Sequence, residues 1–182
     1  MNRQQLAHVL RAACAVANDP NVLVLGSQSI LGSFEETELP AEATASIEAD
    51  IAFLNDPDRQ KADRVDGAIG ELSAFHNTNG VYAEGVHVAT AILPVGWQDR
   101  LVGWDLKSSQ PASPRFLDPH DLAVAKLAAG REKDTDFVSA LIRAGLLDVA
   151  VIRRRVALLP TETDVRIGQR IRTWLRHNSD GP

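Results

Sequence analysis

Two short stretches, Val-Leu-Val-Leu-Gly-Ser at 22–27 and Ile-Glu-Ala-Asp-Ile-Ala-Phe at 47–53, decide how this chain is expected to fold. The first is an apolar run that ends in glycine, which is typical of a buried strand followed by a turn. The second alternates apolar and acidic residues, so Glu48 and Asp50 share one face of a predicted strand. The sequence therefore predicts a Gly-Ser turn after one strand and paired carboxylates on another.

Glu48 and Asp50 form the first candidate metal site. Residues two apart on a strand lie about 7 Å from each other at the backbone, and their side chains can converge on divalent cations. Without a cation, the two carboxylates would repel each other and one pKa would rise. The alternative is that both acids lie on the solvent face of an edge strand, where they bind nothing.

The first half of the chain carries alternating helix and strand signals. Apolar residues at intervals of three and four predict helices over 4–17 and 58–72. A helical turn is possible over 28–32, and a loop that contains Pro40 is expected over 33–45. After a turn at 77–80, the sequence favours two strands, over 81–83 and 86–93.

The second half of the chain is predicted to be helical. Asp118 and Pro119 carry the start signals of a helix over 122–129, and Gly130 carries its stop signal. Further helices are expected over 133–144, 149–158 and from about 165 to 177. The irregular stretch 103–115 is the best candidate for a crossing between two parts of the chain. We therefore expect a core at 1–110 and a helical lobe at 111–182.

Composition excludes several classes of protein. Hydrophobic residues make up 45% of the 182 residues and charged residues 24%, which excludes intrinsic disorder and low complexity. The single cysteine, Cys14, excludes an intramolecular disulfide and a zinc site built on paired thiolates. No apolar run approaches the roughly 20 residues of a membrane span. We expect a soluble, cytoplasmic protein without membrane contacts.

Charge is distributed unevenly along the chain. The net charge of -5 argues against a surface that binds nucleic acid everywhere. The C-terminal region is nevertheless rich in arginine, with Arg153, Arg154, Arg155, Arg166, Arg170, Arg172 and Arg176. This asymmetry would suit an acidic metal site beside a basic C-terminal face. The alternative is that these arginines are only the solvated side of terminal helices.

The order of strand, Gly26-Ser27 turn, connection and acid-x-acid strand resembles the core of the polymerase-β-like nucleotidyltransferases. The resemblance implies an α+β fold, in which a nucleotidyltransferase core with a small mixed sheet is followed by a C-terminal helical lobe. It also implies that Gly26 and Ser27 hold the triphosphate of an NTP. Glu48 and Asp50 would then hold Mg²⁺, with two ions expected.

The segment FLDPHDLAVAKLAAGREKDTDFVSAL at 116–141 resembles the helical lobe of AbiEii-type and MenT-type nucleotidyltransferase toxins. The wider span 22–147 is similar to an AbiEii-related branch of small nucleotidyltransferase-like proteins. The resemblance implies a catalytic and nucleotide-binding role for Lys126, and nucleotide binding by Arg131, Lys133, Asp134 and Asp136. From the residues alone, the two aspartates could instead cap the helix that starts near Lys133.

Two features depart from the family pattern. The connection between Ser27 and Glu48 is longer than the usual one, which loop-closure entropy tolerates because it grows only logarithmically with length. The first acid of the pair is Glu48 where the family has aspartate, and the extra methylene displaces its carboxylate. The superfamily also uses a third metal-binding acid on a later strand, for which Glu84 and Asp105 are the candidates.

The resemblance implies transfer of nucleotides from NTP to an RNA acceptor, the 3′ end of tRNA, by the toxin of a toxin-antitoxin pair. A cognate antitoxin protein would then be a partner. Two alternatives remain open. The acceptor could be a protein or a small molecule such as an antibiotic, or the chain could be a catalytically weakened, antitoxin-like nucleotide-binding module.

Overall fold

The computed structural model describes residues 1–104 and 106–178, so Asp105, one candidate for the third acid, lies outside the described residues. Within the described part, five strands form one mixed sheet in the order β3-β2-β1-β5-β4. The β1–β2 and β4–β5 pairs are antiparallel, whereas β1–β5 and β2–β3 are parallel. The expected small mixed sheet is therefore present. The strands are β1 (Leu23–Val24), β2 (Glu48–Ala52), β3 (Tyr82–Gly85), β4 (Val102–Gly103) and β5 (Arg115–Phe116).

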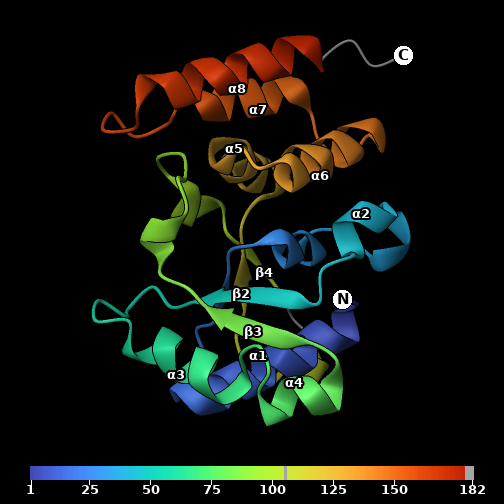
Figure 1. The fold of residues 1–182 in the computed structure, drawn as a ribbon, viewed down its shortest axis with the longest axis vertical. Coiled ribbons are helices and arrows are strands. Elements are labelled where there is room, and N and C mark those ends of the chain that lie inside the picture. Colours follow the sequence, from blue (N-terminus) through green and yellow to red (C-terminus); the bar gives the residue numbers. More distant parts are fainter. Residues whose placement is uncertain (105, 179–182) are drawn as a thin grey trace.

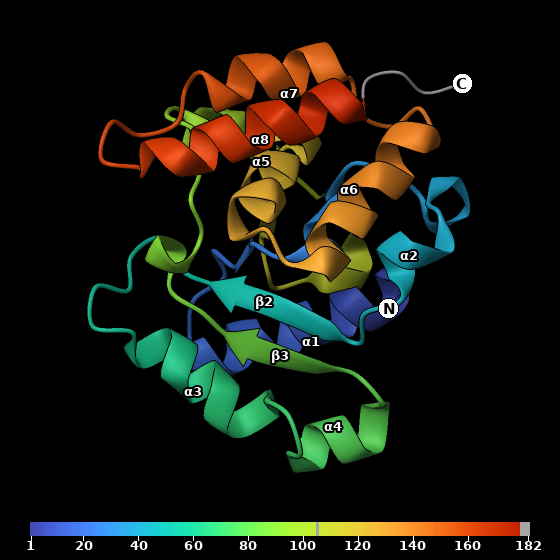
Figure 2. The ribbon, with the colours of Figure 1, turned by 45° about the horizontal axis from the view of Figure 1, so that its top comes forward.

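Helices cover the sheet on both sides (Figure 1). The first group, on one side, consists of α1 (Arg3–Ala17), α3 (Gln60–Ile69) and α4 (Ala74–Asn79). The second group consists of α2 (Ala41–Thr44), α5 (Pro119–Ala129), α6 (Glu132–Arg143), α7 (Val149–Val156) and α8 (Val165–His177). Figure 2 shows that α5 lies between the sheet and the outer pair α7 and α8. In the described part of the chain, no helix is both long and apolar enough to cross a membrane.

The predicted helix starts and stops are confirmed where the side chains supply the caps. Asn2 accepts a hydrogen bond from the backbone N–H of Gln5 and starts α1. Asp118 accepts from the N–H groups of His120 and Asp121 at the start of α5, and Gly130, with φ of +70°, ends that helix. These caps satisfy backbone groups that have no partner inside the helix. The helix boundaries are therefore encoded locally.

The predicted strand over 86–93 is wrong. β3 ends at Gly85, and Val88–Thr90 form a 3-10 turn, whose start is fixed by a 3.1 Å hydrogen bond from the N–H of Ala89 to His87 Nδ1. The apolar residues that suggested a strand pack against the core from this irregular segment instead. Apolar side chains therefore reach the core here without a ladder of backbone hydrogen bonds.

Several short elements were missed. The stretch 33–45 contains the 3-10 turn Glu36–Glu38 and helix α2, and the turn at 77–80 is the end of α4. Four-residue to six-residue helices carry little periodicity, so the sequence pattern does not reveal them. In the stretch 103–115, β5 pairs with β1. The sheet thus continues past residue 110, and the division of the chain there stays a prediction.

A buried carboxylate ties the helices to the loop before β4. Asp121 on α5 is fully buried, and its oxygens accept hydrogen bonds from Arg100 Nε at 2.7 Å and Arg100 Nη2 at 3.2 Å. Arg155 Nε on α7 forms an ion pair with Asp121 Oδ1 at 3.1 Å. Removing one partner from a buried ion pair leaves the other charge without its counter-charge, which destabilises the folded protein.

We expect Asp121→Asn to lower the free energy of unfolding by about 3 kcal/mol, because both arginines lose their counter-charge. Urea denaturation of the purified variant measures the loss. Asp99→Asn is the matched control, since Asp99 is exposed on the neighbouring 3-10 turn (Trp97–Arg100) and should change stability by less than about 0.5 kcal/mol. Equal stabilities of the two variants would contradict a structural role for Asp121.

Candidate active site

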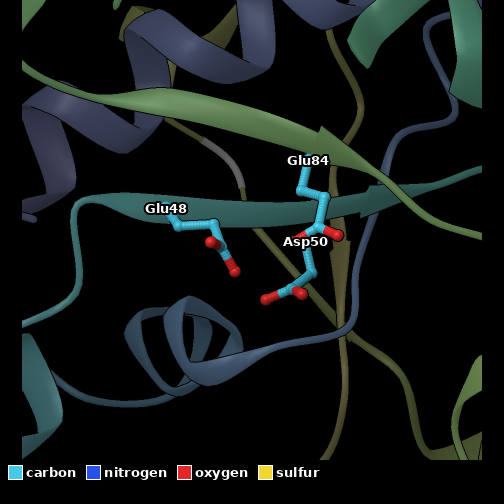
Figure 3. A group of neighbouring side chains, drawn as sticks. All are labelled: Glu48, Asp50 and Glu84. Carbon is cyan, nitrogen blue, oxygen red and sulfur yellow. The ribbon is translucent and has the colours of Figure 1, made fainter. Parts of the chain in front are cut away.

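Three carboxylates from two neighbouring strands meet at one point of the sheet (Figure 3). Glu48 and Asp50 lie on β2, and the parallel register places Glu84 of β3 directly opposite Asp50. One oxygen of each carboxylate lies within 4.8 Å of the other two. The structure thus brings together the predicted acid pair and one of the two candidates for the third acid.

This acidic cluster, Glu48, Asp50 and Glu84, perturbs its own ionisation. Burial, followed by the charge of Glu48, raises the pKa of Asp50. Burial also raises the pKa of Glu84, and the charges of Glu48 and Asp50 add to that shift. Closely spaced carboxylates resist full ionisation unless a cation compensates them. The donor set consists of carboxylate oxygens, which are the ligands that Mg²⁺ prefers, so these residues fit such an ion.

The close approach of Asp50 leaves no room for a side chain at position 26, so the residue there must be glycine. The N–H of Leu25 donates to the carbonyl oxygen of Asp50 at 3.0 Å, which holds the end of β1 against β2. A Cβ atom at Gly26 would lie only 1.5 Å from Asp50 Oδ2. Any side chain at this position would therefore displace the carboxylate. Ser27 follows as the first residue of the 3-10 helix Ser27–Gly32 and lines the same cavity.

Basic side chains come from α5 and from the residue just before α6. Lys126 Nζ lies 3.0 Å from Asp134 Oδ1, and Arg131 Nε lies 2.6 Å from Asp134 Oδ2. Burial opposes ionisation of Asp134, but the hydrogen bonds from Arg131 and Lys126 outweigh it and lower the pKa of that carboxyl. Asp134 thus holds two cationic side chains beside each other.

A cavity of about 620 Å³ separates the acidic and basic walls. This volume is within the usual range of small-molecule sites. Apolar side chains, among them Val86, Ile92 and Phe137, complete its lining. Nine predicted residues line the cavity, namely Gly26, Ser27, Glu48, Asp50, Glu84, Lys126, Arg131, Lys133 and Asp134.

Asp136 does not line this cavity, because it lies on the exposed side of α6. Its nucleotide-binding role stays a prediction. Neither Asp134 nor Asp136 is the residue before the helix, since α6 begins after Arg131 and has no side-chain cap there.

Sequence reasoning missed Glu42 and Ser46, which line the cavity from α2 and the segment that follows it. It also missed Tyr82, whose hydroxyl donates to Glu48 Oε2 at 2.7 Å. The signal for Tyr82 is the pairing of β2 with β3. That register is not readable from one sequence without knowing where each strand begins.

The site therefore has a carboxylate wall suited to divalent cations and a facing wall of lysine and arginine suited to phosphate. A family model described as "Nucleotidyltransferase of unknown function (DUF6036)" matches residues 4–174, which is nearly the whole chain. Searches of the curated proteins and of the solved structures found no match. The chain thus belongs to this family, and it is a nucleotidyltransferase.

Proposed function

We propose that the chain transfers a nucleotide from an NTP to an acceptor hydroxyl, with Mg²⁺ held by Glu48, Asp50 and Glu84. The observation that carries this proposal is that the acidic cluster and Lys126 line one cavity from two different layers of the fold. Three carboxylates within 4.8 Å of one another supply enough oxygen ligands for two ions. Bound Mg²⁺ would neutralise the charge that develops on the phosphates.

In this reaction the acceptor oxygen forms a bond to the α-phosphorus of the NTP. The bond between that phosphorus and the oxygen of the β-phosphate breaks, pyrophosphate leaves, and the acceptor proton passes to water. Lys126, Arg131 and Lys133 would bind the triphosphate, which is supported by the fact that all three line the cavity. Asp134 keeps Lys126 and Arg131 oriented before the nucleotide arrives.

An RNA acceptor is supported by the outer helices. Arg153, Arg172 and Arg176 line an open groove of about 400 Å³ on α7 and α8, together with Gln169 and Thr173. Two further C-terminal arginines connect α7 and α8 to α5. Arg155 forms an ion pair with Asp121, and Arg170 Nη2 donates to the carbonyl oxygen of Ala128 at 2.6 Å. The groove arginines suit backbone phosphates.

The resemblance to AbiEii-type and MenT-type toxins extends the proposal to the 3′ end of tRNA, to a toxin role and to a cognate antitoxin. Incubation with labelled NTP, Mg²⁺ and either total tRNA or a protein mixture tests the acceptor. Labelled tRNA supports the proposal. Labelled protein favours the alternative acceptor, and NTP binding without transfer favours a catalytically weakened module.

We expect Asp50→Asn to lower kcat/KM by at least about 100-fold, which exceeds most losses caused by residues that only support metal ligands. The amide keeps the shape of the side chain but removes the charge that holds a cation, so the fold should be retained. Initial rates across a Mg²⁺ titration and a thermal melt measure both effects. Asp58→Asn, at an exposed position on the loop before α3, is the matched control. Wild-type rates for Asp50→Asn would disprove the proposed metal site.

We expect Gly26→Ala to abolish most of the transfer activity, because the new Cβ and Asp50 Oδ2 cannot occupy the same space. Its stability should change less than its activity, since the displaced group is a side chain. Gly67→Ala is the control, because a Cβ at Gly67 on α3 meets no atom within 4 Å. Rates and unfolding free energies are measured for both variants. A fully active Gly26→Ala protein would show that the observed position of Asp50 is not needed.

The triple variant Arg153→Gln/Arg172→Gln/Arg176→Gln should bind tRNA more weakly and with a flatter salt dependence. Each lost phosphate contact lowers the slope of log affinity against log salt by about 0.7 to 0.9, so three contacts lower it by about 2 to 3. NTP binding should be unchanged. The matched control replaces Arg59, Arg64 and Lys107 with glutamine, which removes three exposed charges elsewhere on the surface. Identical salt slopes for the two triple variants would rule out the groove as the RNA site.

A further inference from the structure

Glu48 carries one more methylene than the aspartate of the family pattern, and therefore one more rotatable bond. A carboxylate on a longer side chain has more conformations to lose when it binds a cation. A fixed hydrogen-bond donor beside it would remove part of that cost before binding. The structure contains such a donor.

Tyr82 lies directly opposite Glu48 in the parallel register of β2 and β3. Its hydroxyl donates to Glu48 Oε2 at 2.7 Å. The backbone N–H of Tyr82 donates to the carbonyl oxygen of Ile47 at 3.1 Å, which fixes the start of its side chain. The donor and the carboxylate are thus set at the same level of the sheet.

The ring of Tyr82 is held as well. The imidazole of His76 packs on it with ring centroids 4.7 Å apart. His76 Nδ1 accepts the backbone N–H of Leu72 at 3.1 Å, and Ser73 Oγ accepts the backbone N–H of His76 at 3.1 Å, so the imidazole is itself oriented by the start of α4. This chain of contacts gives the hydroxyl a defined position. It also gives the short helix α4 a role near the acidic cluster.

We propose that Tyr82 is a positioning residue, which fixes the Glu48 carboxylate at the acidic cluster and so compensates for the longer side chain. This inference rests on the proposed metal-dependent function. Hydrogen-bonded partners of metal ligands are worth about 10-fold to 100-fold in metal affinity. Tyr82 would act through Glu48 and would not touch the nucleotide.

Tyr82→Phe tests the inference, because phenylalanine keeps the ring contact with His76 and removes only the hydroxyl. We expect about 10-fold weaker binding of Mg²⁺ in calorimetry without nucleotide. At saturating Mg²⁺ the KM for NTP should stay unchanged, since the residues that line the phosphate-binding wall are intact. Unchanged Mg²⁺ affinity would overturn the proposal.

The Glu48→Asp variant separates positioning from a general packing role. In that background the shorter side chain no longer reaches the hydroxyl, so adding Tyr82→Phe should cost no further affinity. An equal loss in both backgrounds would contradict the proposal. A wild-type protein that binds no Mg²⁺ would instead refute the proposed function, and thus the two failures are distinguishable.

A second measurement applies if Glu48→Asp binds no metal. Tyr82 is the sole tyrosine of the chain, so protein labelled with ¹³C at the tyrosine Cζ gives one resonance to follow. That resonance should shift during a Mg²⁺ titration with the same midpoint as calorimetry, because its hydrogen-bond acceptor becomes a metal ligand. A resonance that does not move at saturating Mg²⁺ would count against a hydroxyl coupled to the cluster.

Discussion

Repulsion between three carboxylates is the constraint on which this site depends. Burial and the neighbouring carboxylate charges raise the pKa of both Asp50 and Glu84, and the positions of the three acids follow from the pairing of β2 with β3. The fold compensates with positive charge on a different layer, at Lys126 and Arg131. Both cationic side chains donate hydrogen bonds to Asp134, which holds them on the layer that faces the acidic cluster. The result is a cavity with separated charge that a metal and a polyphosphate together would neutralise.

Much of this arrangement could be predicted from local sequence. The Gly26-Ser27 turn, the alternation at 47–53, the apolar spacing over 4–17 and the cap of α5 are short-range signals, and the structure has the elements they predict. The residues selected from these signals, Gly26, Ser27, Glu48 and Asp50, line one cavity. The resemblance to known nucleotidyltransferases added the other five predicted residues that line it, namely Glu84, Lys126, Arg131, Lys133 and Asp134. Periodicity and capping therefore predict most of the longer elements and the carboxylate pair, whereas the basic wall and the third acid were expected from the resemblance alone.

The remainder depends on contacts between distant segments. The contact of Tyr82 with the acidic cluster depends on the register of β2 and β3, which the sequence does not show. The place of Glu42 in the cavity lining depends in the same way on the position of α2 beside α6. The predicted strand over 86–93 failed because apolar side chains can pack on a core from an irregular segment. The ion pair of Arg155 with Asp121 also shows why a count of C-terminal arginines overstates the surface available to an acceptor. Contacts between distant segments decide which arginines form ion pairs inside the fold and which remain on the surface.

The two walls of the cavity come from opposite layers of the fold, with β2 and β3 below and α5 and α6 above (Figure 2). A nucleotide that contacts both walls binds only the folded chain, so it stabilises the fold by mass action. At 100 times its dissociation constant, a ligand adds about 2.7 kcal/mol to the free energy of unfolding. Resistance to proteolysis would then follow the local supply of nucleotide, and the lifetime of the protein in a cell would depend on how often its cavity is filled.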